Sequence, residues 1–226
     1  MKKAFYKAFP YTIPILTGYL FMGIAFGILL NKAGYNFIWA FFMALFMFAG
    51  SMQFVAVELL KQPFNLINVA IMSLLVNARH LFYGISMFNK FDKTSKLKPY
   101  MIHALTNKTY SILCSVNIGK DVSERWFYFF VAFLNHLYWI TGCTLGAILG
   151  SFMNFNSKGI DFTMTALFIV IFIEQWENSK NHIPSVIGLS VTALSLFIFG
   201  KNRFIIISMI GIFILLLILR EKIESE

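Results

Sequence analysis

The sequence predicts an all-α integral membrane protein, a bundle of about seven transmembrane helices in a single transmembrane domain over residues 1–226. Composition carries this prediction: 58% of the residues are hydrophobic and only 13% are charged, whereas soluble proteins are about 45–50% apolar and about 25% charged. The mean hydropathy is +0.72. A helix needs about 20 apolar residues to cross a bilayer, so little of the chain remains for a soluble domain.

Eight apolar segments divide the chain, each bounded by polar residues, proline or glycine. They cover residues 10–30, 36–60, 64–88, 98–118, 126–152, 162–179, 183–199 and 204–219. These runs are apolar on every face, unlike the strands of a membrane barrel. The first run is longer than a signal-peptide core and lacks a cleavage pattern, so we expect a retained span. All prolines lie at or near segment ends, where a missing N–H costs little: Pro10, Pro14, Pro63, Pro99 and Pro184.

The net charge of +9 arises from 19 Lys and Arg against 10 Asp and Glu. Most basic residues lie between apolar runs, at the level of lipid headgroups, so the bilayer explains the charge and no nucleic-acid partner is implied. If all eight segments cross, nine basic residues lie on one side and eight on the other, which is no positive-inside bias. If the element around Arg79 is broken or re-entrant and leaves on the side where it enters, 11 basic residues lie inside and 6 outside. This positive-inside bias favours seven crossings.

The third segment contains the most expensive polar group of the chain. A charged Arg79 at mid-membrane costs about 2.5–3.5 kcal/mol, and Asn77 and His80 flank it on an adjoining helix face. We expect this cluster to line a polar cavity or a helix break. The alternative is that Arg79 extends to a lipid headgroup.

The second segment carries Gly50, Ser51 and Gln53. Small residues let another backbone approach closely, and Ser51 and Gln53 then have polar groups to offer to a neighbour or a ligand. Helix packing alone explains the glycine and the serine, but explains Gln53 less well. We therefore include all three residues in a candidate pathway.

The fourth segment carries Asn107 and Lys108. A lysine at this depth either pairs with a carboxylate or titrates, because burial disfavours its charged form. The candidate partners are Glu58, Glu174 and Glu177. The alternative is a shorter span that ends close to Lys108.

The fifth segment contains Asn135 and His136, and is rich in glycine. A histidine is suited to relay protons, and an interhelical hydrogen bond explains His136 equally well. The glycines predict close helix packing first and a pathway second. The packing candidates are Gly23, Gly27, Gly142, Gly146 and Gly150. The first and fifth segments share a Gly-x3-Gly spacing, and each is followed by an Ala-Leu-Phe sequence. This is either a weak internal repeat of the kind found in transporters or a coincidence of small and aromatic residues in lipid-adapted helices.

Catalytic and metal-binding patterns are absent from the sequence. There is no HExxH, GxSxG or phosphate-binding glycine motif, and no pair of histidines or carboxylates has metal-ligand spacing. Cys114 and Cys143 both fall within apolar runs and are expected to be buried, reduced thiols. We therefore expect no enzyme activity, metal or cofactor.

Three motifs resemble the AzlC family of branched-chain amino acid exporters. They are Gly23-Ile24-Ala25-Phe26-Gly27, Ala49-Gly50-Ser51-Met52-Gln53-Phe54 and Val76-Asn77-Ala78-Arg79-His80-Leu81-Phe82-Tyr83-Gly84. Asn135-His136-Leu137-Tyr138-Trp139 extends the resemblance, which covers about residues 10–180. It implies a permease subunit of the bacterial inner membrane that exports valine, leucine or isoleucine with a small membrane partner of the AzlD type. The chain departs from the family at Thr106-Asn107-Lys108, where the family commonly has Thr-Asp-Glu, an acidic pair suited to proton coupling.

A zwitterionic substrate needs a cation or helix N-terminus for its carboxylate, polar acceptors for its ammonium group and an apolar wall for its side chain. We expect Arg79 to hold the carboxylate, and Asn77, Gln53 and Ser51 to hold the ammonium group. His80 or His136 is the candidate proton carrier. Without a nucleotide-binding motif, the driving force is expected to be an ion or substrate gradient. The rival interpretations are a scaffold subunit that binds no substrate and, less favoured, an intramembrane enzyme.

Overall fold

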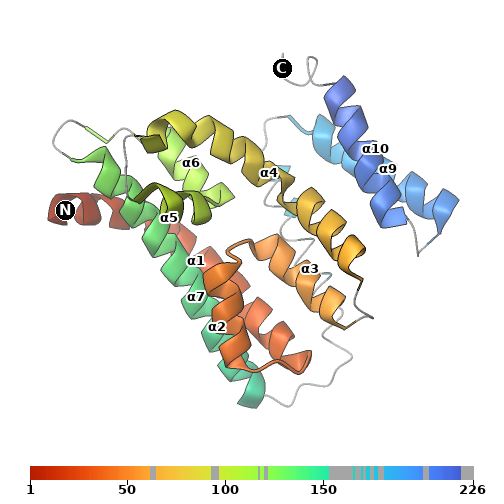
Figure 1. Cartoon of the computed structure of the whole chain (residues 1–226), viewed down its shortest axis with the longest axis horizontal. Coiled ribbons are helices and arrows are strands. Elements are labelled where there is room, and N and C mark those ends of the chain that lie inside the picture. The colour runs from red at the N-terminus through yellow and green to blue at the C-terminus, as the bar shows by residue number, and fades with distance from the viewer. Residues whose placement is uncertain are drawn as a thin grey trace. The chain divides into compact units, whose positions relative to one another are not determined.

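The computed structural model describes residues 1–61, 65–92, 97–116, 118–119, 122–152, 165, 169, 172–173, 176–177, 181–200 and 204–219. Within these residues every regular element is an α-helix (Figure 1), as the composition predicts. The chain divides into two compact units, Met1–Phe155 and Asn156–Glu226, which we describe separately. That both units act as one transport domain stays a prediction.

The longest helices of the first unit, α1 (Lys2–Lys32) and α7 (Glu124–Phe152), lie side by side and run in the same direction (Figure 1). Near their N-terminal ends the rings of Phe5 and Phe130 are 5.3 Å apart, and near their C-terminal ends Gly150 faces Ile28 and Asn31. Among the described helices, these two are long and apolar enough to cross a bilayer by length and composition.

Glycines let α1 and α7 approach closely. A Cβ atom placed on Gly23 would lie 2.9 Å from the backbone nitrogen of Cys143, and one placed on Gly142 would lie 3.0 Å from the carbonyl oxygen of Tyr19. Gly27 and Gly146 are tighter still, because an added Cβ would overlap backbone atoms of the facing helix. The two Gly-x3-Gly motifs therefore meet each other, and packing leaves no room for a side chain at their centre.

Helices α2 (Phe37–Phe46) and α3 (Gly50–Leu60) form a hairpin that starts and ends at the C-terminal end of α1. Gly34, at φ +94°, turns the chain after α1, and α2 then runs back along α7 until its last turn reaches His136. After a three-residue break, α3 reverses direction, so that Phe54 packs against Phe26 near the end of α1 at a ring distance of 5.6 Å.

Helix α4 (Leu66–Asp92) is continuous through Arg79. Its 27 residues span about 40 Å at 1.5 Å per residue, and it runs opposite to α1, since Phe91 packs near Tyr128 in the first turns of α7. The expectation of a broken or re-entrant element near Arg79 is therefore wrong. The breaks lie in the second and fourth segments instead, where Gly50 and the capping residue Thr106 favour new helix starts.

Helices α5 (Lys98–His103) and α6 (Asn107–Ser115) form a second hairpin at the opposite end. The hairpin begins after α4 ends, reaches His103 at its tip, and returns along α4, where Lys90 Nζ donates to the carbonyl of Leu113 at 3.1 Å. Pro99 stands in the first turn of α5, where its missing N–H is harmless. Each hairpin thus consists of two short helices and a three-residue break.

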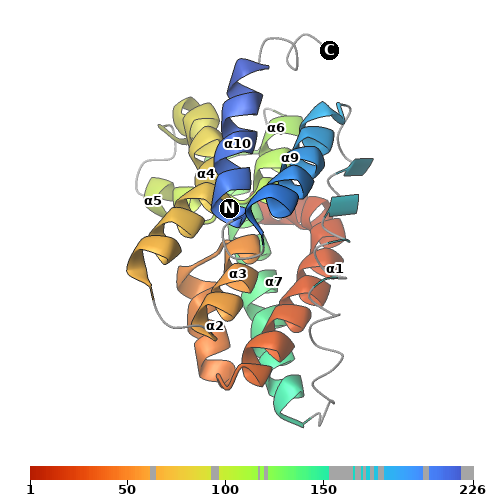
Figure 2. The same cartoon turned by 90° about the vertical axis from the view of Figure 1, so that its right-hand side faces the viewer.

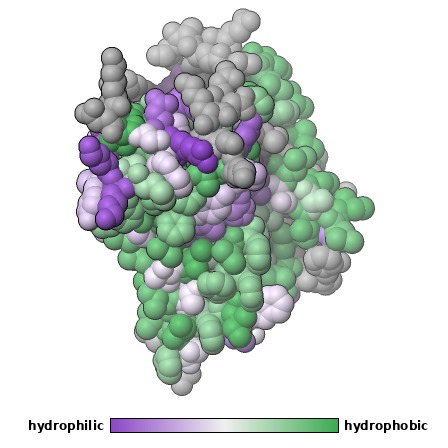
Figure 3. All heavy atoms as spheres, turned by 60° about the vertical axis from the view of Figure 1, so that its left-hand side comes forward, coloured by the Kyte–Doolittle hydropathy of each residue, from purple (hydrophilic) through white to green (hydrophobic). Residues whose placement is uncertain are grey.

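An apolar cluster fills the end of the unit where α1 and α7 begin. It joins α1, α4, α5, α6 and α7, and Lys7 Nζ crosses it to donate to the carbonyl of Ile118 at 2.7 Å. Its buried members are Ala4, Ala8, Met87, Phe91, Met101, Leu105, Ile112, Leu113, Ile118, Phe127, Tyr128 and Val131. On the face shown in Figure 3, hydrophobic residues cover most of the surface and hydrophilic residues gather toward one end, as expected for a protein surrounded by lipid.

In the second unit, α9 (Ile183–Phe199) and α10 (Phe204–Ile218) pack against each other as an antiparallel pair (Figure 2). Gly200, at φ +69°, ends α9 and starts the short connection. Both helices match the predicted segments within one residue. Of the predicted segment 162–179, only residues 165, 169, 172–173 and 176–177 are described, and all of them are helical.

Candidate functional site

The tips of the two hairpins meet beside the middle of α7. His103 Nε2, at the end of α5, lies 3.1 Å from the carbonyl oxygen of Leu45, and His136 Nε2, on α7, lies 3.2 Å from that of Ala44. Both carbonyls belong to the last turn of α2, which has no further helical N–H to bind. Two imidazoles therefore satisfy the backbone groups that the break in the first hairpin leaves open.

His136 links all three elements of this junction. Because a carbonyl only accepts, Nε2 carries the proton toward Ala44, and Nδ1 of the neutral ring accepts from the hydroxyl of Tyr100 at 3.1 Å. The ring also stacks on Phe48 at a centroid distance of 4.5 Å. Its side chain is only 3% exposed, so this histidine is a structural bridge between the hairpins as well as the candidate proton carrier.

A chain of hydroxyl groups surrounds the start of α6. The side chain of Thr106 caps the helix by accepting from the backbone N–H of Thr109 at 3.4 Å, and it bonds the hydroxyl of Tyr19 on α1 at 2.8 Å. Asn135 Nδ2 donates to Thr109 Oγ1 at 3.1 Å. Asn135 is fully buried, and its Oδ1 has no hydrogen-bond partner within the described part of the chain.

Gln53 lies in the second turn of α3 and, like Asn135, is a buried amide at the junction. Trp139 Nε1 donates to Gln53 Oε1 at 2.8 Å, and Gln53 Nε2 is buried with no hydrogen-bond partner among the residues described. The same indole lies against Gly50, where an added Cβ would be 3.1 Å from the ring. Gly50 is thus a close-packing residue, while Gln53 retains an unused donor.

The predicted polar cluster on α4 lies beside this junction. The hydroxyl of Tyr83 donates to Asn107 Oδ1 at 3.4 Å and its ring contacts His80 edge-on at 5.9 Å. Asn77 Nδ2 donates to Ser73 Oγ at 3.5 Å. Arg79 stands thirteen residues from either end of α4, or about 20 Å along the axis, which opposes the headgroup alternative. Its side chain lies outside the described structure.

Ser51 and Lys108 are half-buried in the first turns of α3 and α6. Lys108 is thus close to a helix start, although the helix begins in the middle of the predicted segment. Of its candidate partners, Glu58 accepts from Lys61 Nζ at 2.7 Å, Glu177 belongs to the second unit, and Glu174 lies outside the described residues. The predicted pairing of Lys108 stays a prediction.

The structure thus gathers Gly50, Gln53, Asn135 and His136 at one junction, and connects Asn107 and His80 to it through Tyr83. Sequence reasoning did not assign site roles to Tyr19, Thr106, Thr109 and Trp139, which hold the two amides and the break in place. The sequence did contain a signal for Thr106, because a threonine followed by polar residues inside an apolar run is a helix-start pattern.

The described residues contain no cluster of three metal-binding side chains. Cys143 is buried and free, as predicted. Cys114 is also free but exposed on α6, so the expectation of burial is wrong for this thiol.

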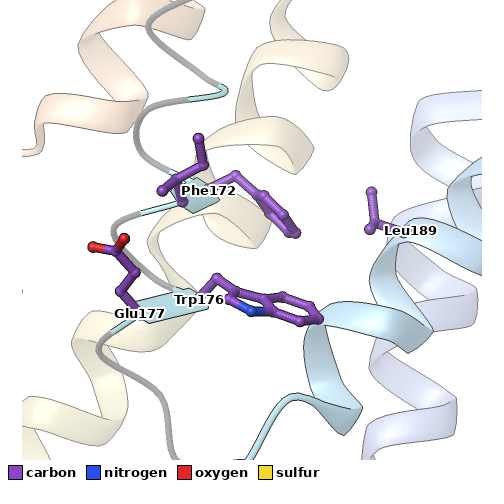
Figure 4. Close-up of a pocket in the computed structure, with 5 residues that line it drawn as sticks. Phe172, Trp176, Glu177 and Leu189 are labelled. Atoms are coloured by element: carbon purple, nitrogen blue, oxygen red, sulfur yellow. The ribbon is translucent and has the colours of Figure 1, made fainter.

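A pocket of about 350 Å³ lies in the second unit, lined by Phe172, Ile173, Trp176, Glu177 and Leu189. Figure 4 shows the rings of Phe172 and Trp176 directed toward Leu189, while the Glu177 carboxylate points away. Its walls are apolar and offer few groups that fix the orientation of a polar ligand. The hairpin junction therefore remains the stronger candidate site.

Helices that break where they meet, with their ends turned toward a polar junction, are typical of membrane transport proteins, and this is the class that the fold and the site define. Comparison with known sequences gives the family. The family model described as AzlC protein matches residues 14–153, and the chain belongs to the AzlC family.

Curated relatives agree with this assignment. The "Branched-chain amino acid transport protein AzlC" of Bacillus subtilis is 49% identical over 98% of this chain and 87% of its own. An uncharacterised membrane protein of Helicobacter pylori is 43% identical over 98% of this chain and 97% of its own. The "Inner membrane protein YgaZ" of Escherichia coli is 23% identical over 75% of this chain and 72% of its own. No solved structure matches the chain significantly. The protein is therefore a transport-related membrane protein.

Proposed function

We propose that this chain is the substrate-carrying subunit of a secondary transporter that exports branched-chain amino acids. The observation that carries the proposal is the 49% identity to a protein named for branched-chain amino acid transport, over nearly the whole chain. A multi-pass location in the bacterial inner membrane accords with the name of the E. coli relative. A small membrane subunit of the AzlD type is the proposed partner.

Helix directions support a definite path through the membrane. Because α1 and α7 are parallel while α4 is antiparallel to them, we propose that these three helices cross the bilayer, and that each hairpin enters from one side and returns to it. The two hairpins then approach from opposite sides and meet at mid-depth. Irregular backbone is tolerated there because protein surrounds it.

The distribution of charge gives this path an orientation. Apart from Arg79 in the middle of α4 and Lys108 at the hairpin junction, the described basic residues of the first unit lie toward its two ends. Six are at the end where α1 and α7 begin, namely Lys2, Lys3, Lys7, Lys90, Lys98 and Arg125, and two are at the other end, Lys32 and Lys61. A ratio of six to two is a positive-inside bias that strict alternation of the segments concealed. We therefore propose that the N-terminus lies in the cytoplasm.

The contacts between the hairpin tips supply a gate. In this conformation the imidazoles of His103 and His136 hold the end of α2, and the amides of Gln53 and Asn135 are fully buried. We propose that substrate passes when one hairpin moves away from the other, breaking these bonds on one side of the junction. Such movement around a central site provides alternating access.

The test is efflux of labelled leucine and valine from loaded bacterial cells that express this chain with its small partner. Active efflux is expected from the wild type and from the exposed control variant Asn36→Asp, because aspartate also accepts the bonds that cap α2. Arg79→Ala is expected to reduce efflux at least tenfold if this guanidinium binds the carboxylate. Efflux no faster from wild-type cells than from cells lacking the chain would refute the proposed function.

A further inference from the structure

Two buried amides at the hairpin junction each have one unsatisfied group. Gln53 Nε2 and Asn135 Oδ1 have no hydrogen-bond partner within the described residues, and both side chains are 0% exposed. A buried polar group without a partner costs about 1–3 kcal/mol. Such a cost is typical of positions where a ligand gains a hydrogen bond.

The neighbours of Gln53 fix the polarity of its free group. The indole N–H of Trp139 is a donor only, and it occupies Gln53 Oε1 at 2.8 Å. The amide cannot be turned around without setting two donors against each other. Gln53 therefore directs its unpartnered Nε2–H donors to a ligand, while Oε1 is already bonded to the indole.

Asn135 has the opposite polarity. Its Nδ2 donates to Thr109 Oγ1, Thr109 Oγ1 bonds Thr106 Oγ1 at 3.1 Å, and Thr106 Oγ1 bonds the hydroxyl of Tyr19. With the Asn135 amide in this orientation, Thr109 donates to Thr106 and Thr106 donates to Tyr19, so that each threonine hydroxyl both accepts and donates. The atom left over is Oδ1, which is an acceptor.

The free donor and the free acceptor lie close together on the same wall. Asn135 and Trp139 are four residues apart on α7 and therefore share a face, and Gln53 is hydrogen-bonded to Trp139. Tyr19 borders both positions, since its ring lies 5.5 Å from that of Trp139 and its hydroxyl bonds Thr106.

We propose that these two amides bind the two poles of an α-amino acid, an inference that rests on the proposed function. The Gln53 Nε2–H groups donate to the substrate carboxylate at the start of α3, whose capping position, Ala49, has no side-chain hydrogen bond to the helix. A helix start favours an anion. Asn135 Oδ1 accepts from the substrate ammonium group. This reverses the role expected for Gln53 from the sequence, because its unpartnered atom is the donor Nε2 and its oxygen is already bonded to Trp139.

The first experiment compares ligands on the wild-type protein. The chain, purified with its small partner, is titrated with leucine, 4-methylpentanoate and 3-methylbutylamine while its thermal stability is measured. The second ligand lacks the ammonium group and the third lacks the carboxylate. We expect leucine to bind at least tenfold more tightly than either analogue, since both poles are recognised.

The second experiment separates the poles with two variants. Gln53→Glu keeps an oxygen for Trp139 and replaces the free donor by an acceptor, so the preference for leucine over 3-methylbutylamine should fall at least tenfold. Asn135→Leu removes the free acceptor, so the preference for leucine over 4-methylpentanoate should fall at least tenfold. The control Asn36→Asp should retain both preferences.

The outcomes distinguish the two proposals. If the wild type binds leucine but either variant keeps its wild-type preference, the recognition pair is wrong and the proposed function stands. If the wild type responds to no branched-chain amino acid, the proposed function fails and the pair with it. If neither variant folds, the wild-type comparison decides, because equal affinity for leucine and either analogue overturns the pair.

Discussion

At the scale of single residues, the junction shows how a membrane protein handles a break in a helix. The last carbonyls of α2 have no helical partner, and in lipid such groups are costly. His103 and His136 supply the missing donors from α5 and α7. The two histidines therefore stabilise the same contact that must open if the hairpins form a gate.

Replacement of His136 by alanine tests this role. The change leaves Ala44 O and the hydroxyl of Tyr100 without their partner, at a cost of about 1–3 kcal/mol for each buried group. We expect a clear fall in the melting temperature of the purified protein. Thr141→Ala is the control on the same helix, since Thr141 is exposed and, among the described residues, donates to the carbonyl of Leu137 in its own helix. Equal melting temperatures for the two variants would contradict the bridging role.

At the scale of secondary-structure elements, the second helix of each hairpin starts in a different way. Helix α6 has a side-chain cap from Thr106, whereas the capping position of α3 is Ala49, which has no side-chain hydrogen bond to the helix. The start of α6 is thus satisfied by the protein itself. The start of α3, with Gln53 in its second turn, is the better place for an anion.

Removal of the α6 cap is expected to destabilise the second hairpin. Thr106→Ala loses the bond to the N–H of Thr109 and the bond to Tyr19, and a lost cap alone costs about 0.5–2 kcal/mol. Thr106→Ser keeps the hydroxyl and should stay close to wild-type stability. Thermal unfolding in detergent measures both variants, and a serine variant as unstable as the alanine variant would show that the methyl group, not the cap, matters.

The contact between α1 and α7 gives a matched pair of glycine substitutions. Gly27→Ala places a methyl group into the backbone of α7, whereas Gly18 on the same helix has no atom within 4 Å of an added Cβ. Overpacking costs about 1–3 kcal/mol, while Gly→Ala in an open helical position gains about 0.5–1 kcal/mol. The melting temperature should fall for Gly27→Ala and stay equal or rise for Gly18→Ala. Similar shifts for both variants would contradict the close approach of the two helices.

At the scale of the whole molecule, the direction of each helix matters more than the number of apolar segments. The path with three crossings and two returning hairpins in the first unit predicts that both ends of a hairpin lie on the same side of the membrane. Strict alternation predicts opposite sides. The two topologies therefore differ at positions that chemical labelling reaches.

Single cysteines at positions 32, 61, 98 and 124, in a chain without Cys114 and Cys143, separate these topologies. Intact cells treated with a membrane-impermeant maleimide should label Lys32→Cys and Lys61→Cys, at the two ends of the first hairpin. Lys98→Cys and Glu124→Cys should react only after the membrane is permeabilised. Opposite labelling of positions 32 and 61 would rule out the returning hairpin.

The sequence by itself determined the class of the protein, because the length and hydrophobicity of apolar runs depend only on local composition. The helix bounds of α9 and α10 followed from it, as did the polar residues Gln53, Asn135 and His136 that need partners in an apolar setting. It did not locate the helix breaks. The break was predicted near Arg79 because a charged group at mid-membrane costs free energy, whereas the local signals at Gly50 and Thr106 were weaker.

Only the tertiary structure decided the directions of the helices and the polarity of the junction. A half-helix that returns and a helix that crosses have the same apolar composition, so charge counting on the sequence grouped Lys61 with the N-terminal lysines, whereas the structure puts it at the same end of the unit as Lys32. The free atom of Gln53 is likewise set by a contact with Trp139, 86 positions away in sequence. An amide carries both a donor and an acceptor, and which one remains for a ligand depends on which neighbour binds the other.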